Sequence, residues 1–290
     1  MSHVMALASA SIDSLPNEVL IQALSSFSTR SLLPYAGVCR RFRGLVGRLH
    51  YYRLVEATVL QDHEVILESY HPSNKISTPS LLCAFLGTDG LSEAGEDASL
   101  EQLNRLYTRF RPYVSDDYRR PRSRWPTLEV HEGTQEPQVE VPSHDVNLES
   151  GELFSQLCTL TNMVKVGPRR GLFLSIANIS DGVIRIWRDW LQNEAAKSTA
   201  VQQQQASPSL DDSSMLWTDS SKNVGLRFRV VNNGNGQAPI LIGPNDELPV
   251  SYTLEYQELI IRTNQLVLSL ETSKAHQVNH AGKALVIASM

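Results

Sequence analysis

Two apolar stripes at the α-helical period, joined by a short polar turn, fill the first fifty residues and most constrain how this chain folds. Pro16 suits the first position of a helix, where its missing N–H is no loss, and Glu18 faces the positive end of the helix dipole. The stripes consist of Val19, Leu20, Ala23, Leu24 and Phe27, then of Val38, Cys39, Phe42, Leu45, Val46 and Leu49. This spacing predicts a small module of short helices.

A module of this size cannot bury all of its apolar surface internally. The surplus must therefore pack either on the rest of the chain or on another protein. Periodicity alone leaves both interpretations open, and it favours an ordinary helical hairpin packed on a larger domain.

The order of the residues in the module resembles the F-box, the short helical module that attaches substrate receptors to cullin-based ubiquitin ligases. The matching positions are Leu15-Pro16, Glu18-Val19-Leu20, Leu24, Phe27, Leu32-Leu33, Val38-Cys39-Arg40, Phe42 and Leu45. Two positions depart from the family pattern. Phe42 stands where tryptophan is common, and Pro34 interrupts the second helix, which should shorten to a turn ending before Pro34.

This resemblance implies that residues 12–50 bind a Skp-family adaptor protein, and a cullin scaffold through that adaptor. The side chains that it implies for adaptor binding are Leu15, Pro16, Val19, Leu20, Leu24, Phe27, Leu32, Val38, Cys39, Arg40, Phe42 and Leu45. The segments Glu64 to Gly90 and Asp246 to Arg262 are also similar to a group of filamentous-fungal F-box proteins with a C-terminal β-rich domain, a resemblance that spans most of the chain. That second resemblance implies an architecture and no defined substrate.

Beyond the module, apolar residues alternate with a period of two, which indicates β-strands. Many short strands separated by turns predict a mainly antiparallel, sandwich-like β domain, so the fold class is α+β. Within it, Leu100, Leu103, Leu106 and Phe110 suggest one amphipathic helix, residues 232–236 form a hairpin turn, and residues 266–270 form a strand. The predicted division is a disordered lead-in at 1–11, the module at 12–50, a β-rich substrate-recognition domain at 54–272 with long flexible insertions at 112–150 and 192–221, and a tail at 273–290.

The sequence offers no signature of an enzyme, a cofactor or a metal. It has no glycine-rich phosphate loop, nucleophile elbow or His-Glu-x-x-His motif, so we predict a non-catalytic protein without cofactors. His276 and His280 stand four apart, but two imidazoles without a third ligand make a poor zinc site. A net charge of −5 and the lack of a long apolar run argue against nucleic-acid and membrane partners. Three scattered cysteines fit a reducing compartment, either the cytoplasm or the nucleus.

Trp187 and Trp190 are weak candidates for substrate binding. On a strand, residues three apart point to opposite faces, so one ring should fill the core while the other lies at the surface. Two rings packed inside the domain are the simpler interpretation.

The sequence therefore favours an F-box substrate receptor that links an unknown target protein to a Skp–cullin ubiquitin ligase. Two alternatives stay open. One is an F-box scaffold that binds the adaptor without joining a ligase, and the other is a ligand- or carbohydrate-binding β-sandwich whose helical start serves only packing.

Overall fold

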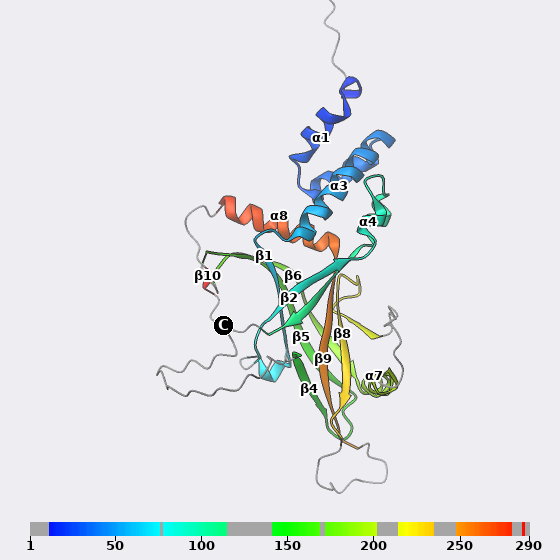
Figure 1. Ribbon diagram of the computed structural model, residues 1–290, viewed down its shortest axis with the longest axis vertical. Coiled ribbons are helices and arrows are strands. Elements are labelled where there is room, and N and C mark those ends of the chain that lie inside the picture. Colours follow the sequence, from blue (N-terminus) through cyan, green and yellow to red (C-terminus); the bar gives the residue numbers. More distant parts are fainter. Residues whose placement is uncertain are drawn as a thin grey trace, which may run out of the picture.

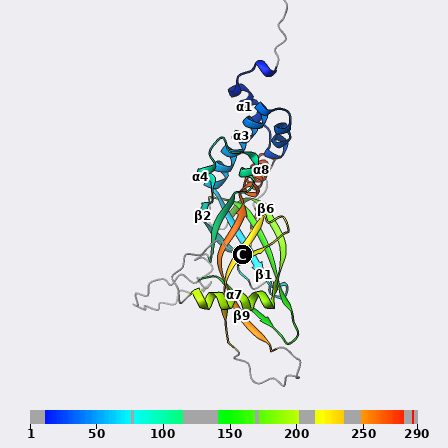
Figure 2. The same ribbon diagram turned by 90° about the vertical axis from the view of Figure 1, so that its right-hand side faces the viewer.

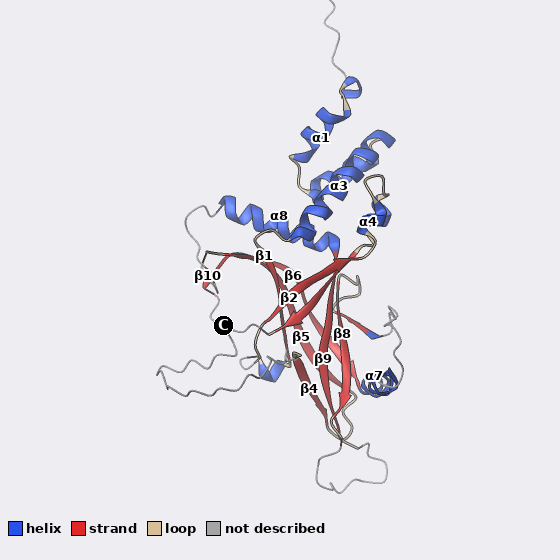
Figure 3. Cartoon of the chain, viewed as in Figure 1, coloured by secondary structure: helices blue, strands red, loops and turns tan. Residues whose placement is uncertain are grey.

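The computed structural model describes residues 12–75, 78–114, 141–168, 172–201, 214–234, 248–279 and 286–287. A helical module stands at one end of a β domain, and helix α8 lies between the two (Figures 1 and 3). The predicted lead-in at 1–11 lies outside the described residues, and so does most of the predicted insertion at 112–150.

The helical module consists of three helices and two 3-10 turns. Helix α1 spans Asn17–Ser25, with Pro16 one position before it as the N-cap residue. Helix α2 is a single turn, Thr29–Leu32, and the 3-10 turn η2, Leu33–Gly37, contains Pro34, so the second helix does end before this proline. Helix α3, Arg40–Val59, is the longest, and η1 covers Ile12–Ser14. The module is closed by a core of Leu20, Leu24, Leu32, Ala36, Leu45, Val46 and Leu49.

In the described residues, the β domain is built from a single antiparallel sheet of ten strands. The predicted antiparallel domain is thus confirmed, with its strands in one curled sheet where a sandwich would have two (Figure 2). The strand order is β10-β6-β5-β1-β2-β3-β9-β8-β7, and β4 also pairs with β9. The strands are β1 His63–Tyr70, β2 Leu81–Thr88, β3 Tyr107–Tyr113, β4 Ser143–Leu148, β5 Phe154–Val166, β6 Leu172–Trp187, β7 Met215–Trp217, β8 Val224–Asn232, β9 Val250–Arg262 and β10 Val286–Ile287.

The sheet curls so far that β6, the second strand in this order, lies against the end of β7, the last strand. A Cβ atom added at Gly182, on β6, would lie 2.8 Å from the carbonyl oxygen of Thr218, so only glycine allows this approach. The hydroxyl of Ser180 also lies 3.1 Å from that of Thr218. One continuous sheet can therefore enclose its own core, because it curls until β6 and the end of β7 are neighbours.

Two longer helices pack against the sheet, and several short ones connect its strands. Helix α7, Arg188–Val201, lies along the side of the sheet next to β8, and α8, Thr263–Asn279, crosses the end nearest the module (Figures 1 and 2). The short helices α4, Leu91–Ala94, and α5, Leu100–Leu103, and the 3-10 turn η3, Pro72–Asn74, connect strands. The main core combines strand residues with Leu54 and Ala57 of α3 and with Leu266, Val267 and Leu270 of α8.

The predicted helix over Leu100 to Phe110 is wrong after its first turn. Leu100–Leu103 is helical, but Tyr107–Tyr113 forms β3. Thr108, Phe110 and Pro112 are all buried, which is the period of a strand. Pro112 is tolerated because β9 pairs with β3 only at residues 107–110, so no bond to β9 is lost there.

The predicted flexible insertions are shorter than expected. Residues 143–148, inside the first, form β4, and α7 and β7 occupy both ends of the second at 192–221. In α7, Leu191, Glu194 and Ala195 are buried at helical spacing, a pattern hidden by the polar residues that follow. Arg188 fixes the start of α7, because its guanidinium donates to the carbonyl oxygens of Glu149, Glu152 and Leu248.

The predicted strand at 266–270 and tail from 273 are also corrected, because Thr263–Asn279 is one helix. Leu266, Val267, Leu270 and Ser273 are buried at steps of one, three and three, which is a helical stripe. The predicted hairpin turn at 232–236 begins at the end of β8, where Gly234 has a φ of +69°, and its remainder lies outside the described residues.

Candidate functional site

The twelve side chains expected to bind a partner fall into three groups. Leu20, Leu24, Leu32 and Leu45 are buried in the core of the module, where they hold its helices together. Leu15 and Phe42 are half-buried and pack against that core from outside. The remaining six are exposed: Pro16, Val19, Phe27, Val38, Cys39 and Arg40.

The exposed group leaves a concentration of apolar side chains on the module. Val38 is 66% exposed, Val19 46% and Phe27 40%. Ile12 and Leu33 belong with them, at 59% and 42%, although neither was among the expected partner-binding side chains. Leu33 follows Leu32 in the sequence, and only the structure shows that Leu32 points inward and Leu33 outward. Five large apolar side chains exposed on so small a module are candidates for a protein-binding surface.

Arg41 fixes the start of α1 from the neighbouring helix. Its Nε donates to Oδ1 of Asn17 at 2.8 Å, and its Nη2 donates to the carbonyl oxygen of Leu15. The Leu15–Pro16 step is therefore held in place by α3, which positions Val19 one turn further along α1.

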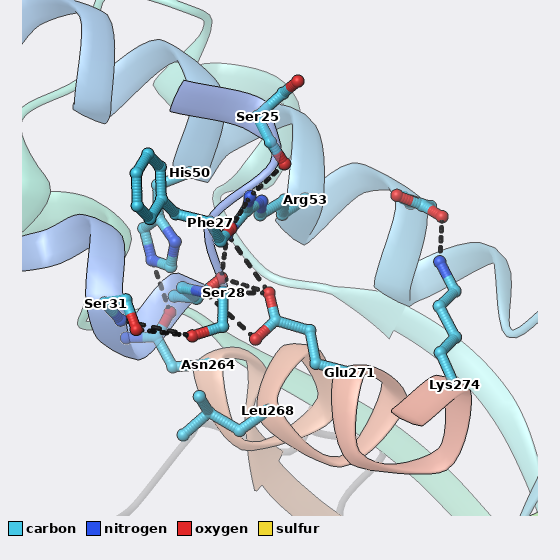
Figure 4. A network of polar contacts seen from close by, with 12 residues as sticks. Ser25, Phe27, Ser28, Ser31, His50, Arg53, Asn264, Leu268, Glu271 and Lys274 are labelled. Atoms are coloured by element: carbon cyan, nitrogen blue, oxygen red, sulfur yellow. Dashed lines mark hydrogen bonds and ion pairs between the residues drawn. The ribbon is translucent and has the colours of Figure 1, made fainter. Parts of the chain in front are cut away.

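The turn between α1 and α2 is held by a polar network that reaches into the β domain (Figure 4). Arg53 of α3 donates to the carbonyl oxygens of Ser25 and Phe27, at 3.1 and 2.5 Å. Glu271 of α8 accepts from the backbone N–H of Thr29 through both carboxylate oxygens, at 3.0 Å each. Arg53 and Glu271 also contact each other at 3.2 Å, so one ion pair joins the module to α8.

Two buried histidines hold α8 at either end. Nε2 of His50, on α3, lies 2.9 Å from Oδ1 of Asn264 at the start of α8. Nε2 of His63, on β1, lies 2.9 Å from the hydroxyl of Ser273, and its Nδ1 lies 2.6 Å from the carbonyl oxygen of Gln61. Burial lowers the pKa of His50 and of His63 below the usual value of 6.5, because desolvation disfavours the imidazolium.

The lowered pKa values make stability depend on pH in a defined direction. Between the folded and the unfolded pKa, the unfolded chain binds more protons, so the free energy of unfolding decreases as pH falls below about 6.5. Burial also lowers the pKa of His144, on β4, which adds to the effect. We expect the melting temperature to fall between pH 7.5 and 5.5, and to fall less steeply in the double variant His50→Gln, His63→Gln. Equal slopes in the two proteins would contradict this assignment.

Trp187 and Trp190 do lie in different surroundings, but only one of them is on a strand. Trp187 ends β6 and is 47% exposed, and Trp190 lies on α7 with its ring packed against the core. The ring of Trp187 lies 5.0 Å from that of Phe154, over which the Arg185 guanidinium sits at 5.5 Å. Trp187 is therefore the tryptophan that a ligand can reach, next to a second aromatic ring and a cation.

Groups suited to other chemistry do not assemble in the described part of the chain. No three His, Cys, Asp or Glu side chains there are placed to hold a metal ion, and no helix there is long and apolar enough to cross a membrane. His276 is exposed near the end of α8, and His280 lies outside the described residues. Cys39, Cys83 and Cys158 are free thiols, and burial raises the pKa of Cys83.

Residues 12–56 match the family model of the F-box-like domain. The match covers the helical module up to residue 56, within α3, six residues beyond the boundary expected from the sequence. Neither a search of curated proteins nor one of solved structures found a match. The helical module is thus an F-box-like domain, and the resemblance to F-box proteins is confirmed. The similarity to filamentous-fungal F-box proteins stays a prediction.

Proposed function

We propose that this F-box protein is a substrate receptor of a Skp–cullin ubiquitin ligase, acting in the cytoplasm or nucleus. The F-box-like domain binds a Skp-family adaptor, a cullin joins through that adaptor, and the β domain holds the target protein. The protein itself needs no catalytic residue, because it raises the effective concentration of the target beside the ubiquitin-loaded enzyme.

One observation supports this function above all others. Val19, Phe27 and Val38 occupy F-box positions, yet they face solvent, although other positions of the same module are buried. An N-terminal hairpin that served only packing would turn such side chains towards the β domain. The exposed side chains supply the apolar anchors that protein interfaces use, with Arg40 beside them at the rim.

The proposal is tested with the double variant Val19→Glu, Val38→Glu in the full chain. Both sites are exposed, so the fold should tolerate the changes, whereas a carboxylate buried against the adaptor would lose its water without gaining a partner. We expect the Kd for a purified Skp-family adaptor to rise at least about a hundredfold, as for interface hot spots.

Val183→Glu is the matched control, because Val183 is 55% exposed on β6, in the β domain. Its Kd should equal that of the unchanged protein. An unchanged protein that binds no adaptor, or a double variant that binds as well, would refute adaptor docking at this surface. Co-purification of a cullin separates a ligase receptor from an F-box scaffold, since only the receptor recruits it.

The β domain offers Trp187, with Phe154 and Arg185, as an accessible aromatic surface for a target. The same surface suits the alternative function, a carbohydrate-binding domain, because sugars stack on exposed tryptophan rings. Trp187→Ala should reduce capture of the target by the receptor and leave adaptor binding intact. Loss of a bound glycan in the same variant would favour the alternative.

A further inference from the structure

The turn between α1 and α2 leaves backbone groups that neither helix can satisfy. The carbonyl oxygens at the end of a helix and the N–H groups at the start of the next have no partner within their own helix. Here Ser25 supplies such a carbonyl oxygen and Thr29 such an N–H, and Phe27 adds a carbonyl oxygen from the turn itself. All three groups are satisfied by side chains from α3 and α8, that is, by helices far from the turn in sequence.

Of the two side chains that satisfy the turn, Arg53 and Glu271, Glu271 is the more distant in sequence. Its carboxylate accepts the Thr29 N–H at 3.0 Å and the Thr29 hydroxyl at 2.6 Å, and it pairs with Arg53 at 3.2 Å. The negative charge sits at the start of α2, where backbone N–H groups favour an anion. The two charged side chains are only 15% and 27% exposed, so solvent screens the pair little.

The same contacts reach a side chain on the exposed apolar surface. The carbonyl oxygen of Phe27 is held by Arg53, and its ring lies 5.5 Å from that of Tyr35 in η2. Arg53 is in turn held by Glu271 and by the Thr29 hydroxyl, which accepts from its Nη1 at 2.8 Å. The backbone that presents Phe27 is therefore fixed by a residue of the C-terminal helix, 244 positions away in the chain (271 − 27 = 244).

We propose that Glu271 is a positioning residue for adaptor binding, through which helix α8 of the β domain completes the F-box-like domain. The inference rests on the proposed function and adds to it a residue outside the matched segment 12–56. Because α8 also contributes Leu266, Val267 and Leu270 to the main core, the adaptor-binding turn and the β domain are held by one helix. A target on the β domain is then presented to the adaptor in a fixed orientation.

The decisive variant is Glu271→Gln in the full chain, titrated against a purified Skp-family adaptor well below its melting temperature. Glutamine keeps the size of the side chain, removes the charge and turns an N–H₂ group towards Thr29 and Arg53. We expect the Kd to rise about tenfold with one adaptor still bound per chain, the loss expected for a charge-assisted hydrogen bond.

Lys274→Gln is the matched control, one turn further along α8. Lys274 also pairs with α3, with Glu56 at 2.5 Å, but both side chains are more than half exposed and neither contacts the α1–α2 turn. This variant should keep the Kd of the unchanged protein. An equal loss in both variants would show that any α8–α3 ion pair suffices and would overturn the role of Glu271.

The titration separates positioning from mere stabilisation. If Glu271 only stabilises the fold, Glu271→Gln lowers the melting temperature or the fraction of active chains but leaves the Kd of the folded chains unchanged, which overturns the proposal. If Glu271→Gln does not fold, Thr29→Val and Thr29→Ser decide instead. We then expect Thr29→Val to weaken binding and Thr29→Ser, which keeps the hydroxyl, to restore it. Equal binding by both overturns the inference, whereas an unchanged protein that binds no adaptor refutes the proposed function itself.

Discussion

Leu54→Asp is expected to unfold the whole protein, whereas Val55→Asp, one residue further along α3, should leave it folded. Leu54 has no exposed surface and belongs to the main core, and Val55 is 37% exposed. Loss of a buried leucine costs about 2–5 kcal/mol, and a carboxylate without a partner adds several more. A domain with a free energy of unfolding of about 5–15 kcal/mol does not tolerate that sum.

Leu54→Asp also tests whether the helical module and the β domain share one core. Helix α3 begins in the helical module and ends in the β domain, where Leu54 and Ala57 join the core. Because one helix serves both parts, we expect the helical and the β signals in circular dichroism to disappear together in Leu54→Asp. Separate transitions, with a helical module that survives the loss of the β domain, would contradict a shared core.

The helical module was predictable because its signals are local. The spacing of apolar residues, the proline before α1 and the N-cap residue Ser28 before α2 all lie within a few residues of the structure they determine. The end of α2 before Pro34 follows from the same local chemistry. The family pattern adds the identity of the module, but it mixes inward residues such as Leu32 with outward residues such as Val38.

The joint between the module and the β domain was not predictable. The predicted boundary between residues 50 and 54 falls within α3, because the first half of that helix has a recognisable pattern and the second half does not. Likewise, Glu271 and Thr29 are 242 residues apart, and a single sequence contains no sign that they meet. Residues 263–279 were divided into a strand and a tail, although Leu266, Leu270 and Ser273 lie on one helical face.

The strands were easier to find than their arrangement. Alternation shows that one face of a strand is buried, but it is the same in a sandwich and in a curled sheet. The single sheet here depends on the close approach of Gly182 to Thr218, a long-range contact between two elements. Similarly, Leu103, Leu106 and Phe110 fit one helical stripe, but they fit equally well a helix that ends and is followed by a strand. Pro112 is compatible with both interpretations.

Phe110 tests by experiment which side of β3 faces the core. It has no exposed surface, and it pairs across the sheet with Phe85, which is 46% exposed, with ring centroids 6.0 Å apart. Phe110→Ala should cost about 3–5 kcal/mol, because it leaves a cavity in the core. Phe85→Ala should cost about 0.5–1.5 kcal/mol, the contribution of the aromatic contact.

The two variants are compared by thermal melting of the full chain at pH 7.5, where the buried histidines are neutral. At about 2–4 °C per kcal/mol, Phe110→Ala should lower the melting temperature by roughly 10 °C and Phe85→Ala by a few degrees. On an outward-facing side of β3, Phe110 would instead lose little more than Phe85 does. Equal shifts would therefore mean that β3 does not turn Phe110 into the core, and that the order of strands around β3 and β9 must be revised.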